Sequence, residues 1–311
     1  MKFDSGYWAI IIGASSGFGL ATAKKLASHG MNLCLVHRDR RGAMKNIQPA
    51  FDEIAATGAQ MLTFNLDALS PEGRAKALDG LAENLGESGS VRLLMHSLAF
   101  GNLKLLAPYE ASGEPARARA RMADLLGVMP QAVDEAAAGL FGEGCPPIHS
   151  LADEAEFNNR FLLEEDDFSR TIHAMGTSLV EWVQDVFNRK MFAADARVLS
   201  LTSEGNAVAW RGYAAVSAAK AALESVSRAI AVEFAPYGIR CNVVQPGVTD
   251  TPAFRAIPGN RQIEAKALLR NPMGRLTTPQ DVANLIFLLC LDEASWINGS
   301  LIPVDGGERI A

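Results

Sequence analysis

The chain of 311 residues has few of the residues on which several protein classes depend. Its four cysteines are scattered and form no Cys-x-x-Cys pair, which favours reduced thiols over a zinc site or a disulfide framework. Its five histidines show no metal-ligand spacing, so we expect no metal site. The longest apolar run, residues 282–291, is too short to span a bilayer and predicts a buried helix.

The chain also has no strong excess of charge of either sign. It holds 29 Lys and Arg against 35 Asp and Glu, a formal net charge of −6, so no basic face indicates nucleic-acid binding. Residues 1–6 lack the basic and apolar regions of a signal peptide. We therefore expect a soluble, cytoplasmic protein that binds neither nucleic acid nor a membrane.

What the sequence does contain is an alternation of short apolar strands and amphipathic helices, which predicts a parallel sheet covered on both faces. The expected strands are residues 8–12, 33–36, 61–65, 91–96, 197–202, 239–245 and 301–304. The expected helices are residues 18–29, 42–56, 71–84, 166–192, 213–234 and 278–291. The pattern predicts a single doubly wound, Rossmann-type α/β domain over residues 1–311.

One stretch, about residues 102–165, interrupts this alternation between the fourth strand and the long helix. Within it, residues 115–126 and 130–140 each begin with proline and are typical of helices. A connection this long inside a compact domain indicates a functional lid or an insertion. We interpret it as a helical insertion that forms either part of the substrate entrance or an oligomer contact.

A glycine-rich segment, residues 13–19, joins the first strand to the first helix. Its glycines permit a tight turn and the close approach of a pyrophosphate, which the free N–H groups of the helix N-terminus would bind. Its place between a strand and a helix predicts a dinucleotide-binding loop rather than an ordinary turn. The expected contacts are Gly13, Ser15, Ser16, Gly17, Phe18 and Gly19.

The end of the second strand bears on the choice of cofactor. Enzymes that bind NAD usually place a carboxylate there, where it accepts hydrogen bonds from the ribose hydroxyls. Here the position is neutral or basic, because His37 and Arg38 follow Val36. The guanidinium of Arg38 would pair with a 2′-phosphate, so we predict NADPH in preference to NADH. Asp39 remains an alternative contact for a ribose hydroxyl.

The Gly-x-x-x-Gly-x-Gly spacing resembles that of the short-chain dehydrogenase/reductase superfamily. Asp67 after the third strand resembles the family's adenine-contacting Asp, and residues 246–251 resemble its Pro-Gly-x-x-x-Thr nicotinamide loop. Residues 302–307 resemble its C-terminal strand and turn, so the likeness covers nearly the whole chain outside the insertion. It implies further cofactor contacts at Leu66, Asp67, Gly247, Val248, Thr249 and Thr251.

The helix over residues 213–234 carries the catalytic pattern, with six residues between Tyr213 and Lys220. Most members of the superfamily use Tyr-x-x-x-Lys, and here that tyrosine position holds Val216. The longer spacing resembles enoyl-(acyl carrier protein) reductases, a divergent branch of the superfamily. Residues 94–99 resemble the His-Ser-Leu/Ile-Ala segment of those enzymes. This segment implies cofactor contacts at Ser97, Leu98 and Ala99.

The resemblance implies reduction of a 2-enoyl thioester, carried on acyl carrier protein or coenzyme A, in fatty acid biosynthesis. Hydride addition to the β-carbon places negative charge on an oxygen two carbons further on. A proton donor placed three residues earlier on a helix lies roughly 4.5 Å further back along the helix axis. That displacement would bring it toward the displaced oxygen. Tyr213 would stabilise the enolate and Lys220 would hold the nicotinamide ribose. Arg117, Arg119 and Arg121 belong either to a solvated helix or to a contact with the carrier's phosphate.

Two features depart from the enoyl reductase pattern. The phosphate loop has the ordinary superfamily form, and Ser203 lies where mainstream relatives keep their catalytic serine. These features keep open an oxidoreductase acting on a carbonyl or alcohol, such as a 3-ketoacyl reductase or a hydroxysteroid dehydrogenase. Met175, in place of the mainstream Asn, weakens that alternative.

A second alternative is a non-catalytic NAD(P)-sensing protein, but a pure sensor would not need Tyr213 with Lys220. We expect a homo-oligomer, dimer or tetramer, because the superfamily commonly assembles through its long helices. We further expect a mobile segment near residues 252–273, and a substrate mouth flanked by Trp210 and Phe254.

Overall fold

The computed structural model describes residues 2–311 and contains one sheet of seven parallel strands. Their spatial order is β3-β2-β1-β4-β5-β6-β7, so the chain winds outward from β1 in both directions. This order confirms the predicted Rossmann-type fold. The strands are β1 (Tyr7–Ile12), β2 (Asn32–His37), β3 (Met61–Asn65), β4 (Ser90–His96), β5 (Phe192–Leu201), β6 (Ile239–Pro246) and β7 (Leu301–Val304).

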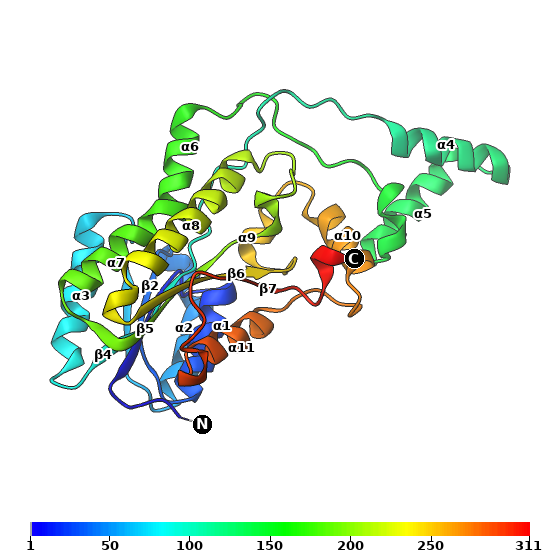
Figure 1. The fold of residues 1–311 in the computed structure, drawn as a ribbon. Coiled ribbons are helices and arrows are strands. Elements are labelled where there is room, and N and C mark those ends of the chain that lie inside the picture. Colours follow the sequence, from blue (N-terminus) through cyan, green and yellow to red (C-terminus); the bar gives the residue numbers. More distant parts are fainter. Residues whose placement is uncertain (1) are drawn as a thin grey trace.

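Helices cover both faces of the sheet (Figure 1). The helices α1, α2 and α11 pack on one face, and α3, α7 and α8 pack on the other. The helices are α1 (Gly17–Ser28), α2 (Arg41–Ala55), α3 (Pro71–Leu85), α4 (Glu114–Leu126), α5 (Pro130–Gly142), α6 (Glu165–Ile172), α7 (Ser178–Asn188), α8 (Ala214–Glu233), α9 (Pro252–Arg255), α10 (Asn260–Arg270) and α11 (Pro279–Leu289).

The central strands are apolar on both faces, which explains their continuous hydrophobic runs. In β1, Ile10 and Ile12 belong to the core under α3, α7 and α8, whereas Ala9 and Ile11 belong to the core under α1, α2 and α11. Successive side chains of a strand point to opposite faces, so a strand covered on both sides must be apolar throughout. This burial makes the strand ends rigid supports for a site.

The long helix expected over residues 166–192 is wrong in two respects. A π-helical turn, His173–Thr177, separates α6 from α7, and Phe192 already belongs to β5. The helix α7 ends early because Lys190 adopts a positive φ of 56°. The amide of Met191 then donates to the carbonyl of Val186, in the hydrogen-bond pattern of a helix terminus that usually uses glycine.

The segment expected to be mobile, residues 252–273, contains the two helices α9 and α10. Thr251 caps α9, because its hydroxyl accepts a hydrogen bond from the amide of Phe254 at 3.2 Å, and Pro252 follows as the first helical residue. The segment is therefore mostly helical, and its mobility stays a prediction.

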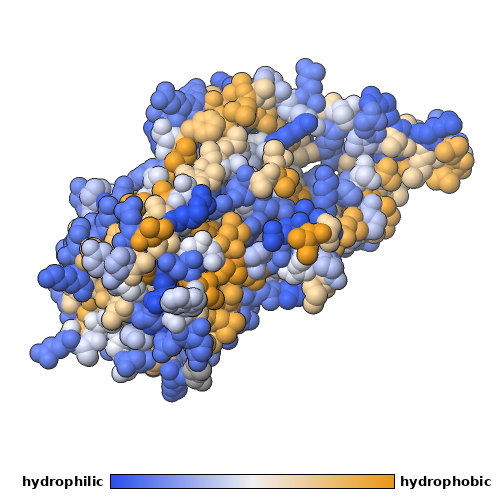
Figure 2. All heavy atoms as spheres, viewed as in Figure 1, coloured by the Kyte–Doolittle hydropathy of each residue, from blue (hydrophilic) through white to orange (hydrophobic). Residues whose placement is uncertain are grey.

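The insertion forms the expected two helices, α4 and α5, which project away from the sheet as an arm (Figure 1). Apolar side chains are exposed at the turn between them, among them Leu125, Leu126 and Met129. Figure 2 shows this apolar surface at the far end of the arm.

Two buried arginines connect the opposite, amino-terminal edge of the sheet to α11. Arg92 of β4 and Arg197 of β5 are both fully buried, and they donate to the carbonyls of Cys290 and Leu289 at the end of α11. Cations at a helix C-terminus are stabilising there. Asp195 accepts hydrogen bonds from both guanidinium groups and from Arg240. Its pKa is lowered because these arginines outweigh the opposing effect of burial.

We expect Asp195→Asn to destabilise the fold, because it leaves buried guanidinium groups without their counter-charge. The loss of unfolding free energy should be about 2 kcal/mol, less than the ~3–5 kcal/mol for a fully buried pair because the Asp195 side chain is 31% exposed. Asp292→Asn is the matched control, since Asp292 pairs with Arg92 but is 89% exposed. Urea unfolding of both variants tests this, and equal losses would contradict it.

Candidate active site

The carboxyl ends of the parallel strands meet at one edge of the sheet, where two connected cavities of about 830 and about 230 Å³ lie. This edge is where ligands bind in open α/β sheets. The segment Ser97–Ala99 after β4 and Thr251 after β6 line both cavities. We call the larger one the adenosine cavity and the smaller one the catalytic cavity.

The glycine-rich loop and the ends of β2 and β3 surround the adenosine cavity. Most of the predicted cofactor contacts therefore line this cavity. Those lining it are Gly13, Ser15, Ser16, Gly17, Phe18, His37, Arg38, Leu66, Asp67, Ser97, Leu98, Ala99 and Thr251. The remaining predicted contacts of the nicotinamide loop, Gly247, Val248 and Thr249, line the catalytic cavity.

The backbone of the glycine-rich loop fits a dinucleotide. Gly13 has a φ of 90°, and a Cβ there would lie 2.4 Å from the carbonyl oxygen of Ser97. Gly17 also has a positive φ and begins α1, so its peptide opens onto the cavity at a helix N-terminus. Gly19 lies behind the loop, where a Cβ would be 2.1 Å from the Gly13 carbonyl. Gly19 therefore packs the turn instead of lining the cavity.

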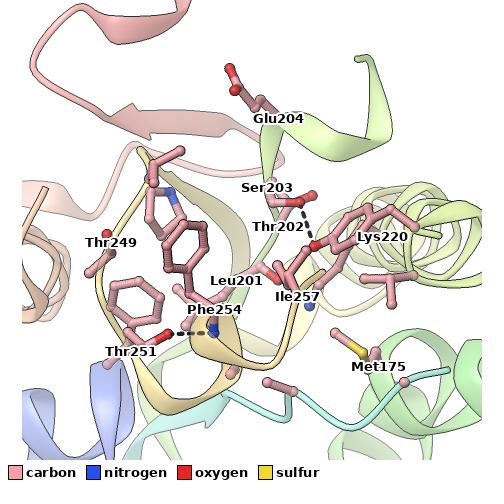
Figure 3. A pocket seen from close by; sticks show the side chains of 18 of the residues that line it. Met175, Leu201, Thr202, Ser203, Glu204, Lys220, Thr249, Thr251, Phe254 and Ile257 are labelled. Carbon is pink, nitrogen blue, oxygen red and sulfur yellow. Dashed lines mark hydrogen bonds between the residues drawn. The ribbon is translucent and has the colours of Figure 1, made fainter. Parts of the chain in front are cut away.

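Tyr213, Ser203 and Lys220 meet in the catalytic cavity. Tyr213 is the residue immediately before α8, and its hydroxyl lies 3.3 Å from the Oγ of Ser203. Lys220 lies further along α8, where its Nζ donates to the carbonyl of Leu201 at 2.7 Å. In Figure 3 the dashed line from Ser203 marks its hydrogen bond with Tyr213, and Lys220 lies on the same side of the pocket. The structure thus brings the three predicted catalytic residues together.

Burial sets the protonation of these groups. Burial raises the pKa of Tyr213, against the opposing hydrogen bond with Ser203, so the phenol stays protonated near neutral pH. Burial lowers the pKa of Lys220 to about 8, with Glu224 opposing the change. Burial and the charge of Lys220 lower the pKa of His96 to about 3. His96 is hence neutral; it lines neither cavity, and its Nε2 lies 2.9 Å from the Oγ of Ser178.

The rest of the catalytic cavity is mostly apolar. Trp210 and Phe254, which we expected at the substrate mouth, both line it. Sequence reasoning missed Leu103 and Ile257, because apolar side chains in irregular segments give no periodic signal. The acidic residue Glu204 also lines the cavity, but Arg270 of α10 pairs with it at 2.6 Å.

The base of the insertion contacts the loop that precedes Tyr213 and α8. The Arg211 guanidinium, two residues before Tyr213, lies 4.0 Å from the centre of the Tyr109 ring. On the other side, Gln262 of α10 donates to the carbonyl of Asp153 at 2.9 Å. The insertion is therefore in contact with the loop before Tyr213 and with α10.

The arginines of α4 do not form a phosphate site as a group. Arg119 is buried and pairs with Asp134 and Asp153, and Arg117 pairs with Glu114. The two carboxylates occupy the buried Arg119 guanidinium, so the hypothesis of a phosphate contact is wrong for Arg119. The pair of Arg117 and Glu114 is exposed, so a phosphate contact of Arg117 stays a prediction. Arg121 is exposed.

Comparison with known families agrees with this geometry. A family model described as short chain dehydrogenase matches residues 7–104, and one described as enoyl-(acyl carrier protein) reductase matches residues 148–308. The chain belongs to the short-chain dehydrogenase/reductase family. It is therefore an NAD(P)-dependent oxidoreductase, as predicted. The helices α4 and α5 lie between the two matches, in the segment that we interpreted as an insertion.

Individual relatives differ in their named activities. The chain is 27% identical to cis-4-hydroxycyclohexanecarboxylate dehydrogenase of Sinomonas cyclohexanicum, over 96% of this chain and 95% of that protein. It is 29% identical to protein FixR of Bradyrhizobium diazoefficiens, over 59% of this chain and 66% of that protein, just under two thirds of FixR's length.

Two solved structures share the fold over 98% of both chains, each with a TM-score of 0.69 and 21% identity. One is an enoyl-[acyl-carrier-protein] reductase (NADH) from Aquifex aeolicus VF5, and the other is a short chain dehydrogenase from Burkholderia cenocepacia J2315 in complex with NADP.

No helix within residues 2–311 has the length and apolar character needed to cross a bilayer. Within the same residues, no group of three or more His, Cys, Asp and Glu side chains is placed to hold a metal ion.

The Lys220 ammonium should make cofactor binding depend on pH. Because the pKa of Lys220 is lowered to about 8, the proton is lost as the pH rises through that value, and affinity for the nicotinamide nucleotide should fall there. Lys220→Met should weaken binding by roughly 10- to 100-fold at pH 7, the effect of one charged hydrogen bond. Binding titrations from pH 6.5 to 9.5 test this, and a variant that keeps the wild-type pH dependence would refute the role.

Proposed function

We propose that the chain is an NADPH-dependent reductase of the carbon–carbon double bond in 2-enoyl thioesters, carried on acyl carrier protein or coenzyme A. The observation that carries the proposal is the position of the buried phenol. Tyr213 precedes α8 and faces the catalytic cavity, while Val216 lines the same cavity at the position where most of the family has its tyrosine. A valine there cannot donate a proton, so the donor lies one helical turn further back.

The arrangement suits charge that develops away from the carbon receiving hydride. A bound nicotinamide supplies the hydride to the β-carbon. Tyr213 donates a hydrogen bond to the thioester oxygen as it becomes an enolate, and its raised pKa keeps the phenol protonated. A proton from solvent then adds to the α-carbon, which returns the enolate to a saturated thioester. Oxidation of an alcohol would instead need a phenolate, which burial disfavours. Lys220 provides a cation close to the same oxygen, and Ser203 orients the phenol.

A second candidate is a reductase acting on carbonyl groups. It is favoured by the hydrogen bond between Ser203 and Tyr213, because a serine beside the donor suits a ketone oxygen. The relative from Sinomonas is also named as a dehydrogenase. Against it, the cavity wall at Met175 is apolar where mainstream members have an asparagine.

The test is NADPH oxidation measured with crotonyl and acetoacetyl thioesters side by side. We expect turnover with crotonyl thioester and little with acetoacetyl thioester. Tyr213→Phe should lower turnover by about 10²–10³-fold with unchanged cofactor affinity, because its hydrogen bond acts on the developing charge. Turnover that survives this change would refute the assignment of Tyr213.

Ser203→Ala separates the two candidates further. For the enoyl reductase we expect a loss below about tenfold, because Ser203 then acts by orienting Tyr213 through their hydrogen bond. For a carbonyl reductase the loss should approach that of Tyr213→Phe. A preference for acetoacetyl thioester together with a large Ser203→Ala effect would replace the proposal with the second candidate.

The proposed preference for NADPH rests on the end of β2. The Arg38 side chain is 69% exposed, lines the adenosine cavity and lies 3.1 Å from a carboxylate oxygen of Asp67. Arg40 lines the same cavity, so two cations face the region where a 2′-phosphate would lie.

Arg38→Ala should lower kcat/KM for NADPH by about 10- to 100-fold, the effect of losing one charge-assisted contact. The value for NADH should change by less than about twofold, which serves as the internal control. Steady-state kinetics with both cofactors measure this. Equal losses for the two would show that Arg38 does not recognise the 2′-phosphate.

A further inference from the structure

The loop after β2 contains an acidic residue, Asp39, that is held by the strand before it. The Nδ1 of His37 lies 2.8 Å from a carboxylate oxygen of Asp39. A carboxylate can only accept hydrogen bonds, so Nδ1 carries the proton and donates it. His37 is the last residue of β2, and its side chain is only 2% exposed. The surrounding core therefore holds the His37 ring, and with it the Nδ1 donor, in a fixed position.

Two more contacts hold this arrangement in place. The amide of Asp39 donates to the Asn65 side-chain oxygen at 2.9 Å, and the Asn65 side-chain nitrogen donates to the Asp39 carbonyl, also at 2.9 Å. The ring of Phe51 packs edge-on against His37, with the ring centres 5.4 Å apart. Both the backbone and the carboxylate of Asp39 are thus restrained.

The restraint has a consequence for the adenosine cavity. Asp39 lines that cavity, and a carboxylate near this strand end could accept hydrogen bonds from the ribose hydroxyls of NADH. The same carboxylate would repel the 2′-phosphate of NADPH. With Asp39 bound to His37, Arg38 and Arg40 are the cations that line the cavity beside it, and Arg38 also pairs with Asp67 at 3.1 Å.

We propose that His37 determines the cofactor preference by holding the Asp39 carboxylate away from the ribose. His37 is then a positioning residue that acts through Asp39, without a contact of its own to the 2′-phosphate. The inference rests on the proposed preference for NADPH, and it is independent of which thioester or ketone the chain reduces.

The test is equilibrium binding of NADP⁺ and NAD⁺, measured by calorimetry without any substrate. His37→Leu removes the donor while keeping an apolar side chain in the core. We expect it to strengthen NAD⁺ binding and weaken NADP⁺ binding, so that the ratio of the two affinities shifts by at least tenfold. His37→Asn is the matched control, because its amide nitrogen can still donate to Asp39, and it should keep the wild-type ratio.

A double-mutant cycle with Asp39→Ala identifies the route. Asp39→Ala alone should change NAD⁺ affinity by less than about twofold, because the carboxylate is already engaged. The double variant His37→Leu/Asp39→Ala should lose the tenfold shift, since no carboxylate is then released. A shift that persists in the double variant, or an unchanged ratio in His37→Leu, would overturn the proposal.

Further measurements separate this inference from the proposals on which it rests. His37→Val, whose branched side chain suits a strand end, repeats the test if His37→Leu does not fold. Wild-type chain that binds NAD⁺ more tightly than NADP⁺ would refute the NADPH preference and this inference with it. Failure to reduce crotonyl thioester would refute only the enoyl reductase proposal, because the binding ratios are obtained without substrate.

Discussion

The candidate site depends on one buried interaction, the hydrogen bond from the Lys220 ammonium to the carbonyl of Leu201 at the end of β5. It fixes α8 against the sheet, so that Tyr213 at the start of the helix meets Ser203 just after the strand. Burying an ammonium is unfavourable without a partner, which the lowered pKa of about 8 reflects. This one hydrogen bond therefore determines both the position of the Tyr213 phenol and the charge of the site.

This bond requires α8 to lie close to its neighbours. A Cβ on Gly176 would lie 2.9 Å from the carbonyl oxygen of Ala219, so the π-helical turn before α7 approaches the α8 backbone directly. The same turn places Met175 in the wall of the catalytic cavity, next to Gly101. The π-helical turn, with its one extra residue, thus presents the apolar side chain of Met175 to the cavity. An asparagine at that place would provide polar groups. An apolar wall suits the acyl chain of the proposed substrate.

The strands and the cofactor loop could be predicted because their signals are local. Continuous apolar runs mark strands covered on both faces. In the loop of residues 13–19, Gly13 and Gly17 are required by their positive φ and Gly19 by its close packing on Gly13. The spacing of Tyr213 and Lys220 also keeps its meaning in the fold, because Tyr213 is the N-cap residue of α8 and Lys220 lies on that helix. The end of α7 was missed because Lys190 takes the positive φ that usually indicates glycine. The burial of Arg119 was missed because its partner Asp153 is distant in sequence, and hydropathy alone predicts an exposed arginine.

The insertion shows how a family fold acquires a separate element without disturbing its centre. Its helices lie outside both family matches and extend away from the sheet (Figure 1), so they can vary without changing the strand ends. Its base, in contrast, stacks Tyr109 on Arg211 and binds Gln262 through Asp153. Those contacts support the loop before Tyr213 on one side and α10 on the other. A change at the base would therefore alter the loop before Tyr213, whereas a change in the arm would reach α10 through Arg261, which donates to the carbonyl of Phe141 in α5.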